Sequence, residues 1–413
     1  MKQNFNSDFL KIMHQRGFIH QTTDTENLGK TLEEGSICGY IGFDCTAPSL
    51  HVGSLVQIMM LRWFQKTGNK PIVLMGGGTT KIGDPSGKDT ARPLLTNEKI
   101  QENQNSLRTV FQKYLKFGDA GNDAIMLDNA DWLEKLNYIS FLRDFGSSFS
   151  VNKLINLESI KRRLEREQNL SFLEFNYSLL QAFDYLKLNE DYSCRLQMGG
   201  SDQWGNIITG VELIRKKTSQ SVYGLTSPLL TTSSGAKMGK TASGAVWLNS
   251  DQLSDWDFWQ YWRNTEDLDV IKFMKLFTEL PMEEINRFEQ LKGAEINQAK
   301  IILANEVTKL CRSKESADKI SVSSANVFNK KESDETLPFV NIDAHQISLI
   351  DALRILNFVQ TNGEARRLIR GNGAKINDNV ITDENYLLKM EDYLNNSVKI
   401  SSGKKKHGLL KLS

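Results

Sequence analysis

Three neighbouring segments decide the fold: SICGYIGF (36–43), VGSLVQIMMLRWFQKT (52–67) and KPIVLMGGG (70–78). The first and third are short apolar runs typical of buried strands, and the middle one keeps apolar residues at helical spacing until Gly68. Strand, helix and strand within about forty residues predict a βαβ unit. Such a unit implies a parallel α/β sheet that binds ligands at the carboxyl ends of its strands.

A second corner of the same kind follows later in the chain. CRLQM (194–198) is typical of a strand, GGSD of a turn, and QWGNIITGVELIRKK (203–217) of a helix. A mostly helical insertion, roughly residues 130 to 190, separates the two corners. We therefore predict a Rossmann-like, parallel-sheet domain over residues 1–245 with this insertion inside it.

The rest of the chain predicts three further parts. Residues 246–328 have a helical pattern, for example EINQAKIILANEVTKLCRS, and predict a helical domain. NKKESDETLP (329–338) is polar, charged and ends in proline, so we place a linker over residues 329–344. Residues 345–413 form a unit of their own with eleven Lys or Arg against seven Asp or Glu.

The overall composition argues against several classes of protein. With 51 basic and 50 acidic residues, the chain as a whole favours no particular charged partner. It has no run of eighteen apolar residues and no apolar stretch of signal-peptide type near the start, so we expect no membrane segment. Its four cysteines show neither CxxC pairing nor metal-ligand spacing, which favours a reducing cytoplasm over disulfides or zinc.

Four motifs carry the functional signal, and each has an ordinary structural alternative. In YIGFDCTAPSLHVGS (40–54), Gly53 lets another group approach the start of a helix. A helix N-terminus attracts anions, and Thr46 and His51 could add hydrogen-bond donors there. A capped helix with a packed histidine explains the same residues equally well.

GGGTTKIGDPSGK (76–88) suggests a P-loop but fails as one. That motif would need Gly at position 82 and Ser or Thr at position 89, where Ile82 and Asp89 stand. What remains is a glycine-rich turn that carries one carboxylate, Asp84, with basic residues behind it. In isolation, a surface loop is the ordinary interpretation.

The last two motifs are a helical stripe and a lysine-bearing loop. In FNYSLLQAFDYL (175–186), Tyr177, Gln181 and Asp184 share one side of a helix, which suits either a small polar ligand or a solvated face. GAKMGKT (235–241) holds two lysines three residues apart in a glycine-rich loop. Two ammonium groups near one point suit a polyphosphate, although such a loop is more often only solvated.

Together and in this order, the motifs resemble a class I aminoacyl-tRNA synthetase of the bacterial-type tyrosyl-tRNA synthetase family. HVGS stands where the family has its HIGH motif, and KMGKT stands where it has KMSKS. The blocks YIGFDCTAPSLHVG, IGDPSGK, LLQAFDYL and QMGGSDQWGN match the family almost throughout. The tail resembles the small RNA-binding module named after ribosomal small-subunit protein four, so the resemblance covers essentially the whole chain.

The resemblance implies both an architecture and a reaction. It implies a Rossmann-like catalytic domain, a helical anticodon-side domain and a small C-terminal α+β RNA-binding domain. The family activates L-tyrosine with MgATP to tyrosyl-adenylate and pyrophosphate, and then transfers tyrosine to the terminal ribose of tRNA(Tyr). We therefore expect a cytoplasmic homodimer with ATP as substrate, Mg²⁺ carried with the ATP and no separate metal site.

The resemblance also implies roles for individual residues. Tyr40 and Asp184 should meet the phenolic hydroxyl, and the other tyrosine-binding residues should be Asp84, Tyr177, Gln181 and Gln203. ATP-binding residues should be Gly42, Asp44, His51, Gly53, Gly200, Asp202 and Lys240. Groups acting on the phosphates should be Thr46, His51, Lys88, Arg92, Lys237, Lys240 and Thr241. RNA-binding residues should be Arg366, Arg367, Arg370, Lys404 and Lys405.

The chain departs from the family pattern at two motif positions. Ser54 replaces the second histidine of HIGH, which keeps a donor but shortens its reach. Gly239 replaces the common serine of KMSKS, which we interpret as a looser loop.

Three other functions compete with this interpretation. A tryptophanyl-tRNA synthetase would not explain Tyr40 with Asp184, a combination suited to a phenol, and such a tail is not usual there. A general nucleotidyltransferase would not explain the basic tail. A catalytically inactive, synthetase-like RNA-binding protein should have lost some of the carboxylates or lysines, and none is missing.

Overall fold

The structure is a computed structural model, and it falls into two compact units. The first consists of Met1–Gln252 with Glu266–Ile296, and the second of Leu253–Thr265 with Asn297–Ser413. The residues that the structure describes are 5–86, 95–235, 238–241, 244–291, 293–328, 337–343, 346–403 and 406–412.

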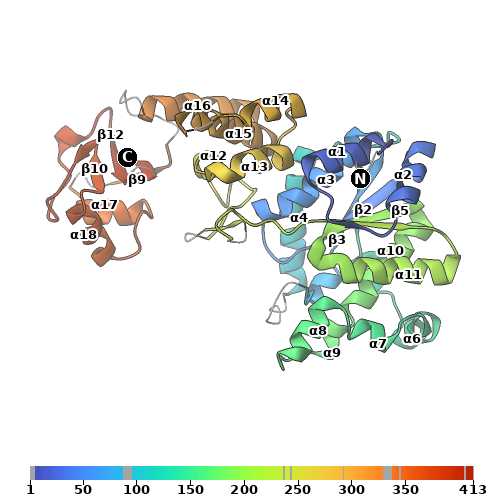
Figure 1. The fold of residues 1–413 in the computed structure, drawn as a ribbon. Helices are drawn as coiled ribbons and strands as arrows, with labels where there is room; N and C mark the ends of the chain where they lie inside the picture. Colours follow the sequence, from blue (N-terminus) through green and yellow to red (C-terminus); the bar gives the residue numbers. More distant parts are fainter. Residues whose placement is uncertain are drawn as a thin grey trace. The chain divides into compact units, whose positions relative to one another are not determined.

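In the described part of the first unit, six strands form one sheet in the order β1-β6-β5-β2-β3-β4 (Figure 1). Neighbouring strands are parallel, except that β1 pairs antiparallel with β6. The chain runs from β2 outward to β3 and β4, and then returns to β5 and β6 on the other side of β2. This confirms the predicted α/β class and places a topological switch point between β2 and β5. The strands are β1 Gln21–Thr22, β2 Cys38–Asp44, β3 Lys70–Gly76, β4 Ile125–Asp128, β5 Cys194–Gly200 and β6 Tyr223–Ser227.

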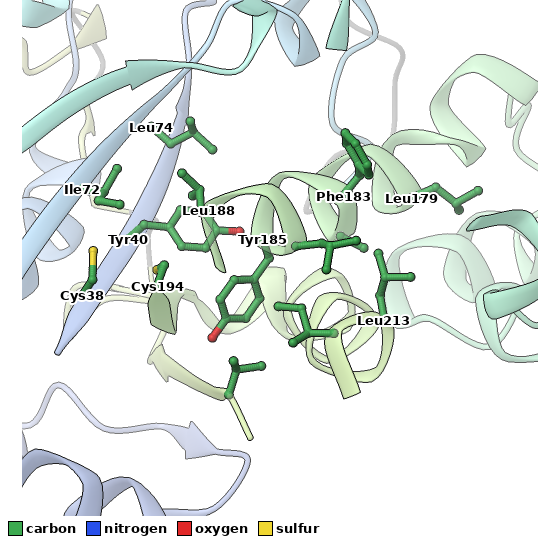
Figure 2. Close-up of a cluster of buried hydrophobic side chains, with 14 of the residues drawn as sticks. Cys38, Tyr40, Ile72, Leu74, Leu179, Phe183, Tyr185, Leu188, Cys194 and Leu213 are labelled. Atoms are coloured by element: carbon green, nitrogen blue, oxygen red, sulfur yellow. The ribbon is translucent and has the colours of Figure 1, made fainter. Parts of the chain in front are cut away.

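Helices cover both faces of this sheet, which is why its strands are apolar almost throughout. On β2, Gly39 faces the Phe64 ring of α3 (Leu55–Lys66), since a Cβ there would lie 2.9 Å from that ring. The next residue, Tyr40, faces the opposite way, into a cluster with α10 (Tyr177–Tyr192). Figure 2 shows that cluster, in which the Tyr40 and Tyr185 rings lie 5.3 Å apart.

The insertion between the two corners is helical and ends in the helix that carries the polar stripe. Its apolar side chains, such as Phe141 and Leu154, join the cluster under the sheet. Its elements are α5 Ala130–Leu133, α6 Tyr138–Phe145, η3 Gly146–Ser148, α7 Val151–Leu154, α8 Glu158–Glu165, α9 Phe172–Phe175 and α10. The remaining elements before residue 250 are α1 Asp8–Arg16, α2 Thr25–Glu34, η1 Val52–Ser54, η2 Thr79–Lys81, α4 Asn97–Tyr114, η4 Ser201–Gln203, α11 Trp204–Thr218, β7 Lys240–Thr241 and β8 Gly244–Ala245.

Residues 266–296 belong to the first unit because polar side chains of the sheet domain hold them there. The Arg16 guanidinium donates to the carbonyl oxygens of Lys275 at 3.0 Å and Thr278 at 2.9 Å. Arg62 of α3 pairs with Glu279 at 2.8 Å. The predicted helical domain (246–328) is therefore divided between the two units, and the elements on this side are η5 Asp267–Asp269, α13 Val270–Phe277, α14 Met282–Phe288 and η6 Gly293–Glu295.

The second unit combines helices with a small mixed sheet. Its helices before the tail are α12 Asp255–Arg263, α15 Ile296–Cys311 and α16 Lys314–Phe328. In the described part of the tail, five strands follow the order β11-β10-β12-β13-β9 around a core that includes Leu349, Leu353 and Ile369. The tail's elements are β9 Phe339–Ile342, α17 Leu349–Ile355, α18 Asn362–Arg370, β10 Ala374–Ile376, β11 Asn379–Val380, η7 Met390–Asp392, β12 Ser397–Ser402 and β13 Lys406–Leu412.

Strand β9 lies inside the linker that the sequence predicts over residues 329–344. It pairs in parallel with β13, so residues 339–342 are part of the tail's sheet. A four-residue strand with its partner about seventy residues later leaves no periodic signal in the sequence. The other domain boundaries stay predictions.

Candidate active site

A pocket of about 710 Å³ opens where the carboxyl ends of β2 and β5 meet. This is the switch point of the sheet, where ligands bind in doubly wound folds. It is lined by every predicted tyrosine-, ATP- or phosphate-site residue whose side chain or glycine backbone the structure describes: Tyr40, Gly42, Asp44, Thr46, His51, Gly53, Asp84, Tyr177, Gln181, Asp184, Gly200, Asp202 and Gln203.

Five predicted residues lie wholly or partly outside the described part of the pocket. Lys88, Arg92 and Lys237 lie outside the described residues. Lys240 and Thr241 are described as backbone, in strand β7, which pairs antiparallel with β8. Their predicted contacts with phosphates therefore stay predictions.

The most buried end of the pocket is built around Asp184, on the inner side of α10. Its carboxylate accepts hydrogen bonds from Asn129 Nδ2 at 2.9 Å and from Trp132 Nε1 at 2.7 Å. Burial raises the pKa of Asp184 to about 7, although these two hydrogen bonds act in the opposite direction. Asn129 and Trp132 were missed by the sequence analysis; the available signal was a polar residue directly after strand β4.

The Tyr40 hydroxyl lies at the same end without a partner of its own. It is buried and makes no hydrogen bond with the described part of the chain. Burial first, and the charge of Asp184 second, raise the pKa of Tyr40 well above its ordinary value, so the hydroxyl stays protonated. A buried hydroxyl without a partner is costly. This end of the pocket therefore suits a ligand that brings its own hydrogen-bonding group.

Two further carboxylates, Asp44 and Asp84, lie near the Tyr177 hydroxyl. Tyr177 Oη donates to Asp44 at 3.1 Å, and Thr79 Oγ1 donates to the same carboxylate at 2.9 Å. Burial, followed by the charges of Asp44 and Asp84, raises the pKa of Tyr177 well above its ordinary value. This part of the pocket is negative and rich in acceptors, which favours a cationic group such as an ammonium.

Asp84 is held in place by the second corner of the sheet. Its carboxylate accepts from Gln203 Nε2 at 2.7 Å and from the Ser86 N–H at 2.8 Å. Asn206 of α11 donates to Gln181 at 3.0 Å and to Gln203 at 3.2 Å. The helical stripe of α10 and the start of α11 thus form one polar network, in which Asn206 is a third residue that the sequence did not indicate.

The glycine-rich turn that failed as a P-loop has a structural reason for its glycines. The Gly77 N–H donates to Asp128 at 3.0 Å, and the Gly78 N–H donates to Asn129 at 2.8 Å. A Cβ on Gly76 would collide with the carboxylate of Asp44. The turn therefore positions Asp44 and Asn129 in the pocket.

The HVGS residues form the turn between β2 and α3, which we call the HVGS turn (51–54). His51 Nδ1 accepts the Gly53 N–H at 3.0 Å, so the neutral ring carries its proton on Nε2, where it can donate. Ser54, which replaces the second histidine, also lines the pocket. This end of the pocket therefore presents a histidine and a helix N-terminus together.

Gly239 brings the lysine-bearing loop against this turn. Its φ of +95° favours glycine, and a Cβ on it would lie only 3.0 Å from His51 Nδ1 and 3.1 Å from the Gly53 nitrogen. From the sequence alone, Gly239 predicts a looser loop. The structure gives it a different reason, because the close approach to His51 and Gly53 needs a residue without a side chain.

The described residues hold no group of three or more His, Cys, Asp or Glu side chains that could bind a metal ion. No helix among them is long and apolar enough to cross a membrane.

The comparisons with known proteins identify the family of this chain. The family model described as tRNA synthetases class I (W and Y) matches residues 32–329. The chain belongs to this family. Over 407 residues it is 54% identical to the tyrosine–tRNA ligase of Novosphingobium aromaticivorans, and the match covers 98% of this chain and 99% of the relative. Over 415 residues it is 52% identical to that of Rhodopseudomonas palustris, with 99% of each chain covered.

A solved synthetase structure gives the same result. A C-terminally truncated mitochondrial tyrosyl-tRNA synthetase from Aspergillus nidulans superposes with a TM-score of 0.69 at 30% identity. The match covers 78% of this chain and 94% of that one. The synthetase fold of the catalytic part is therefore confirmed by structure as well as by sequence.

The predicted RNA-binding residues lie in the second unit, on α18. Arg366, Arg367 and Arg370 are exposed there, while Ala365 and Ile369 of the same helix are buried. Glu384 forms an ion pair with Arg370, and its Oε2 lies 3.8 Å from Arg366 Nε. It therefore offsets part of the positive charge of these two arginines. Lys404 and Lys405 lie outside the described residues.

Proposed function

We propose that this chain is a tyrosine–tRNA ligase, which activates L-tyrosine with ATP and transfers it to the terminal adenosine of tRNA(Tyr). The observation that carries the proposal is the buried end of the pocket, where Tyr40 and Asp184 offer a donor and an acceptor to one hydroxyl group. A phenol fits there, because it can donate to Asp184 and accept from Tyr40. The indole of tryptophan has no acceptor nitrogen to use the Tyr40 hydroxyl.

Rejection of phenylalanine follows from the same pair. Phenylalanine would leave the buried Tyr40 hydroxyl without a partner and would give Asp184 no donor beyond Asn129 and Trp132, which costs more than the loss of one hydrogen bond. Tyrosyl-tRNA synthetase is itself the standard example of this rule. Asn129 and Trp132 would fix the direction in which Asp184 accepts, so we assign them a positioning role.

The substrate's ammonium group would lie between Asp84, Tyr177 and Gln181. The Asp84 carboxylate provides the charge, and the other two provide oxygen acceptors. Gln203, which donates to Asp84, would also reach the carboxylate end of the amino acid. Gly42, Asp44, Gly200 and Asp202 would contact the ribose of ATP, since they lie at the carboxyl ends of β2 and β5 and directly after β5.

The chemistry then needs no nucleophile from the protein. A carboxylate oxygen of tyrosine attacks the α-phosphorus of ATP and forms the mixed anhydride, while the bond to the β-phosphate breaks and pyrophosphate leaves with its electron pair. Thr46, His51 and Lys240, with Lys88, Arg92, Lys237 and Thr241, would stabilise charge that builds on the phosphates. Magnesium would arrive bound to the phosphates of ATP, as part of the substrate.

Transfer to tRNA adds the basic tail to the function. Phosphate contacts from α18 and its neighbours would hold the tRNA. Such contacts weaken as the salt concentration rises, because the release of counterions from the RNA becomes less favourable. Arg367 should matter more than Arg370, because Glu384 already pairs with Arg370. Arg367→Ala should therefore weaken tRNA(Tyr) binding and reduce its salt dependence more than Arg370→Ala does, without changing tyrosine activation.

We also infer a cytoplasmic homodimer. Cys38, Cys45 and Cys194 are buried and form no disulfide, which suits a reducing compartment. On the insertion, Ile139, Val151 and Phe172 are 69%, 63% and 68% exposed, and a second copy of the chain would cover such apolar groups. Sedimentation of Ile139→Asp should show monomers where the natural chain sediments as a dimer, and a monomeric natural chain would contradict this inference.

The reaction is tested by ATP–pyrophosphate exchange with purified protein. Exchange should require tyrosine, and neither phenylalanine nor tryptophan should replace it at equal concentration. Exchange that depends on tryptophan would make the chain a tryptophanyl enzyme. Binding of tRNA without exchange for any amino acid would leave only the RNA-binding alternative.

A further inference from the structure

The segment that leads into the lysine-bearing loop is fastened to a helix outside the pocket. We call this segment the loop stem (residues 229–235). The Ser233 N–H donates to Asp269 Oδ2 at 2.7 Å, and Ser233 Oγ lies 2.6 Å from Glu266 Oε2 and 3.0 Å from Asp269 Oδ2. The carbonyl of Thr231 accepts from Lys272 Nζ at 2.6 Å. Asp269 and Lys272 belong to the start of α13, and no residue of α13 is among those that line the pocket.

Asp269 stands at a position where an aspartate side chain usually caps the start of its own helix. It occupies the N-cap position of α13, yet its side chain makes no capping hydrogen bond there. It is only 3% exposed. A buried carboxylate needs hydrogen-bond donors, and Ser233 of the loop stem supplies them. Docking of the stem and burial of Asp269 are therefore linked.

The stem connects this anchor to the phosphate end of the pocket. Leu229, Leu230 and Thr231 line the pocket, and the Leu230 carbonyl accepts the Met238 N–H at 3.1 Å. The next residue, Gly239, lies against His51 of the HVGS turn. A shift of the stem would thus move residues 238 and 239 relative to that turn.

The other end of α13 is held to the helix that begins at the HVGS turn. Arg16 donates to the carbonyl oxygens of Lys275 and Thr278 at the end of α13. Its guanidinium also lies 4.4 Å from the centre of the Trp63 ring on α3. Helix α13 therefore connects both sides of the phosphate end. It contacts the lysine-bearing loop through the loop stem, and it contacts the HVGS turn through Arg16 and α3.

We propose that Asp269 is a positioning residue for tyrosine activation. It holds the loop stem so that the backbone of residues 238–241 stays against the HVGS turn, and the loop's phosphate-binding groups are correctly placed when ATP is bound. Asp269 itself touches no substrate. The proposal deepens the proposed function and rests on it.

Steady-state exchange kinetics on the full-length protein test this role. Asp269→Ala should lower kcat for tyrosine-dependent pyrophosphate exchange about tenfold, because the hydrogen bond from the Ser233 N–H to a carboxylate is lost. The KM for tyrosine should change less than about twofold, since the amino-acid end of the pocket is untouched. Asp269→Asn keeps an acceptor oxygen for the Ser233 N–H and should recover most of the rate. Glu283→Ala removes an exposed carboxylate of α14 in the same unit and should change nothing.

A second variant separates positioning from folding. Ser233→Ala removes only the hydroxyl of an exposed residue, so the melting temperature should stay unchanged while kcat falls by a smaller factor. Combined with Asp269→Ala, its effect should be less than multiplicative, because both variants remove the contact between Ser233 Oγ and Asp269. An unchanged kcat in Ser233→Ala and Asp269→Ala, or a parallel loss in kcat and tyrosine affinity, would overturn the positioning role. Absence of tyrosine-dependent exchange in the natural chain would instead overturn the proposed function.

Discussion

The two ends of the pocket are built in different ways. The amino-acid end is assembled from β2, α10 and the residues after β4, and Asp184 already has two donors in place before any ligand arrives. The phosphate end is assembled from the HVGS turn and a loop whose contact with that turn is a glycine. Recognition of the amino acid therefore depends on a buried, prearranged network, whereas catalysis depends on how a turn and a loop meet.

Removal of Asp184 should have the largest effect on recognition of the amino acid. Asp184→Ala strands the donors of Asn129 and Trp132 and removes the acceptor for the phenol, so tyrosine affinity should fall by more than about 3 kcal/mol. The advantage of tyrosine over phenylalanine in pyrophosphate exchange should shrink at the same time. Asp191→Ala, which changes an exposed carboxylate of the same helix, is the control. Undiminished discrimination in Asp184→Ala would remove Asp184 from the specificity role.

Removal of Lys240 should affect only the phosphate end. Its ammonium group would act on charge that develops in the transition state, so Lys240→Ala should raise the barrier by about 3 kcal/mol. Tyrosine binding, measured by equilibrium dialysis, should be unchanged, as it should be in the control Lys113→Ala on α4. A variant that loses tyrosine affinity while keeping its activation rate would show that the two ends are not separate.

The pH dependence of stability should report on the amino-acid end. The pKa of Asp184 is about 7 in the folded chain against an ordinary 3.8, so the folded state holds a proton that the unfolded state releases. The resulting stabilisation is complete below about pH 4 and is lost as the pH rises through about 7. The free energy of unfolding of the ligand-free protein should fall by about 2 kcal/mol between pH 5 and pH 7.

Substitution identifies the source of this pH dependence. Asp184→Asn cannot titrate, so its melting temperature should decline less over the same range than that of the natural chain. Asp202→Asn, at an exposed position on the ATP side, should keep the full decline. The same decline in all three proteins would show that Asp184 does not change its charge between pH 5 and pH 7.

The difference between the ends also explains what the sequence could reveal. The spacing of Tyr177, Gln181 and Asp184 predicts a shared helix side, because that relation is local. Asn129 and Trp132 reach Asp184 from more than fifty positions away, through the pairing of β4 with β3, and no local pattern encodes that. The α/β class could be predicted from the sequence for the same reason as the polar stripe of α10, because each βαβ corner is a local pattern.

Gly239 is a position where the local sequence suggests an interpretation, but that interpretation is incomplete. A glycine in a loop suggests freedom, and only the structure shows that it is pressed against His51 and Gly53, residues almost two hundred positions earlier. Close backbone approach and flexibility select the same residue, so the sequence does not distinguish them. A substitution at this position can.

Gly239→Ala should have a smaller effect than the removal of Asp184 or Lys240, and it should act on kcat alone. Alanine at a φ of +95° is strained by about 1 kcal/mol, and its Cβ would also press on His51 Nδ1 at 3.0 Å. We expect the rate of tyrosine-dependent exchange to fall about fivefold at unchanged tyrosine affinity.

Gly235→Ala is the matched control: its φ of +82° gives similar strain, but nothing lies within 4 Å of the added Cβ. A larger loss in Gly239→Ala than in Gly235→Ala would assign the effect to the contact with the HVGS turn. Equal losses would assign it to backbone strain, and full activity in Gly239→Ala would mean that the loop and the turn separate during the reaction.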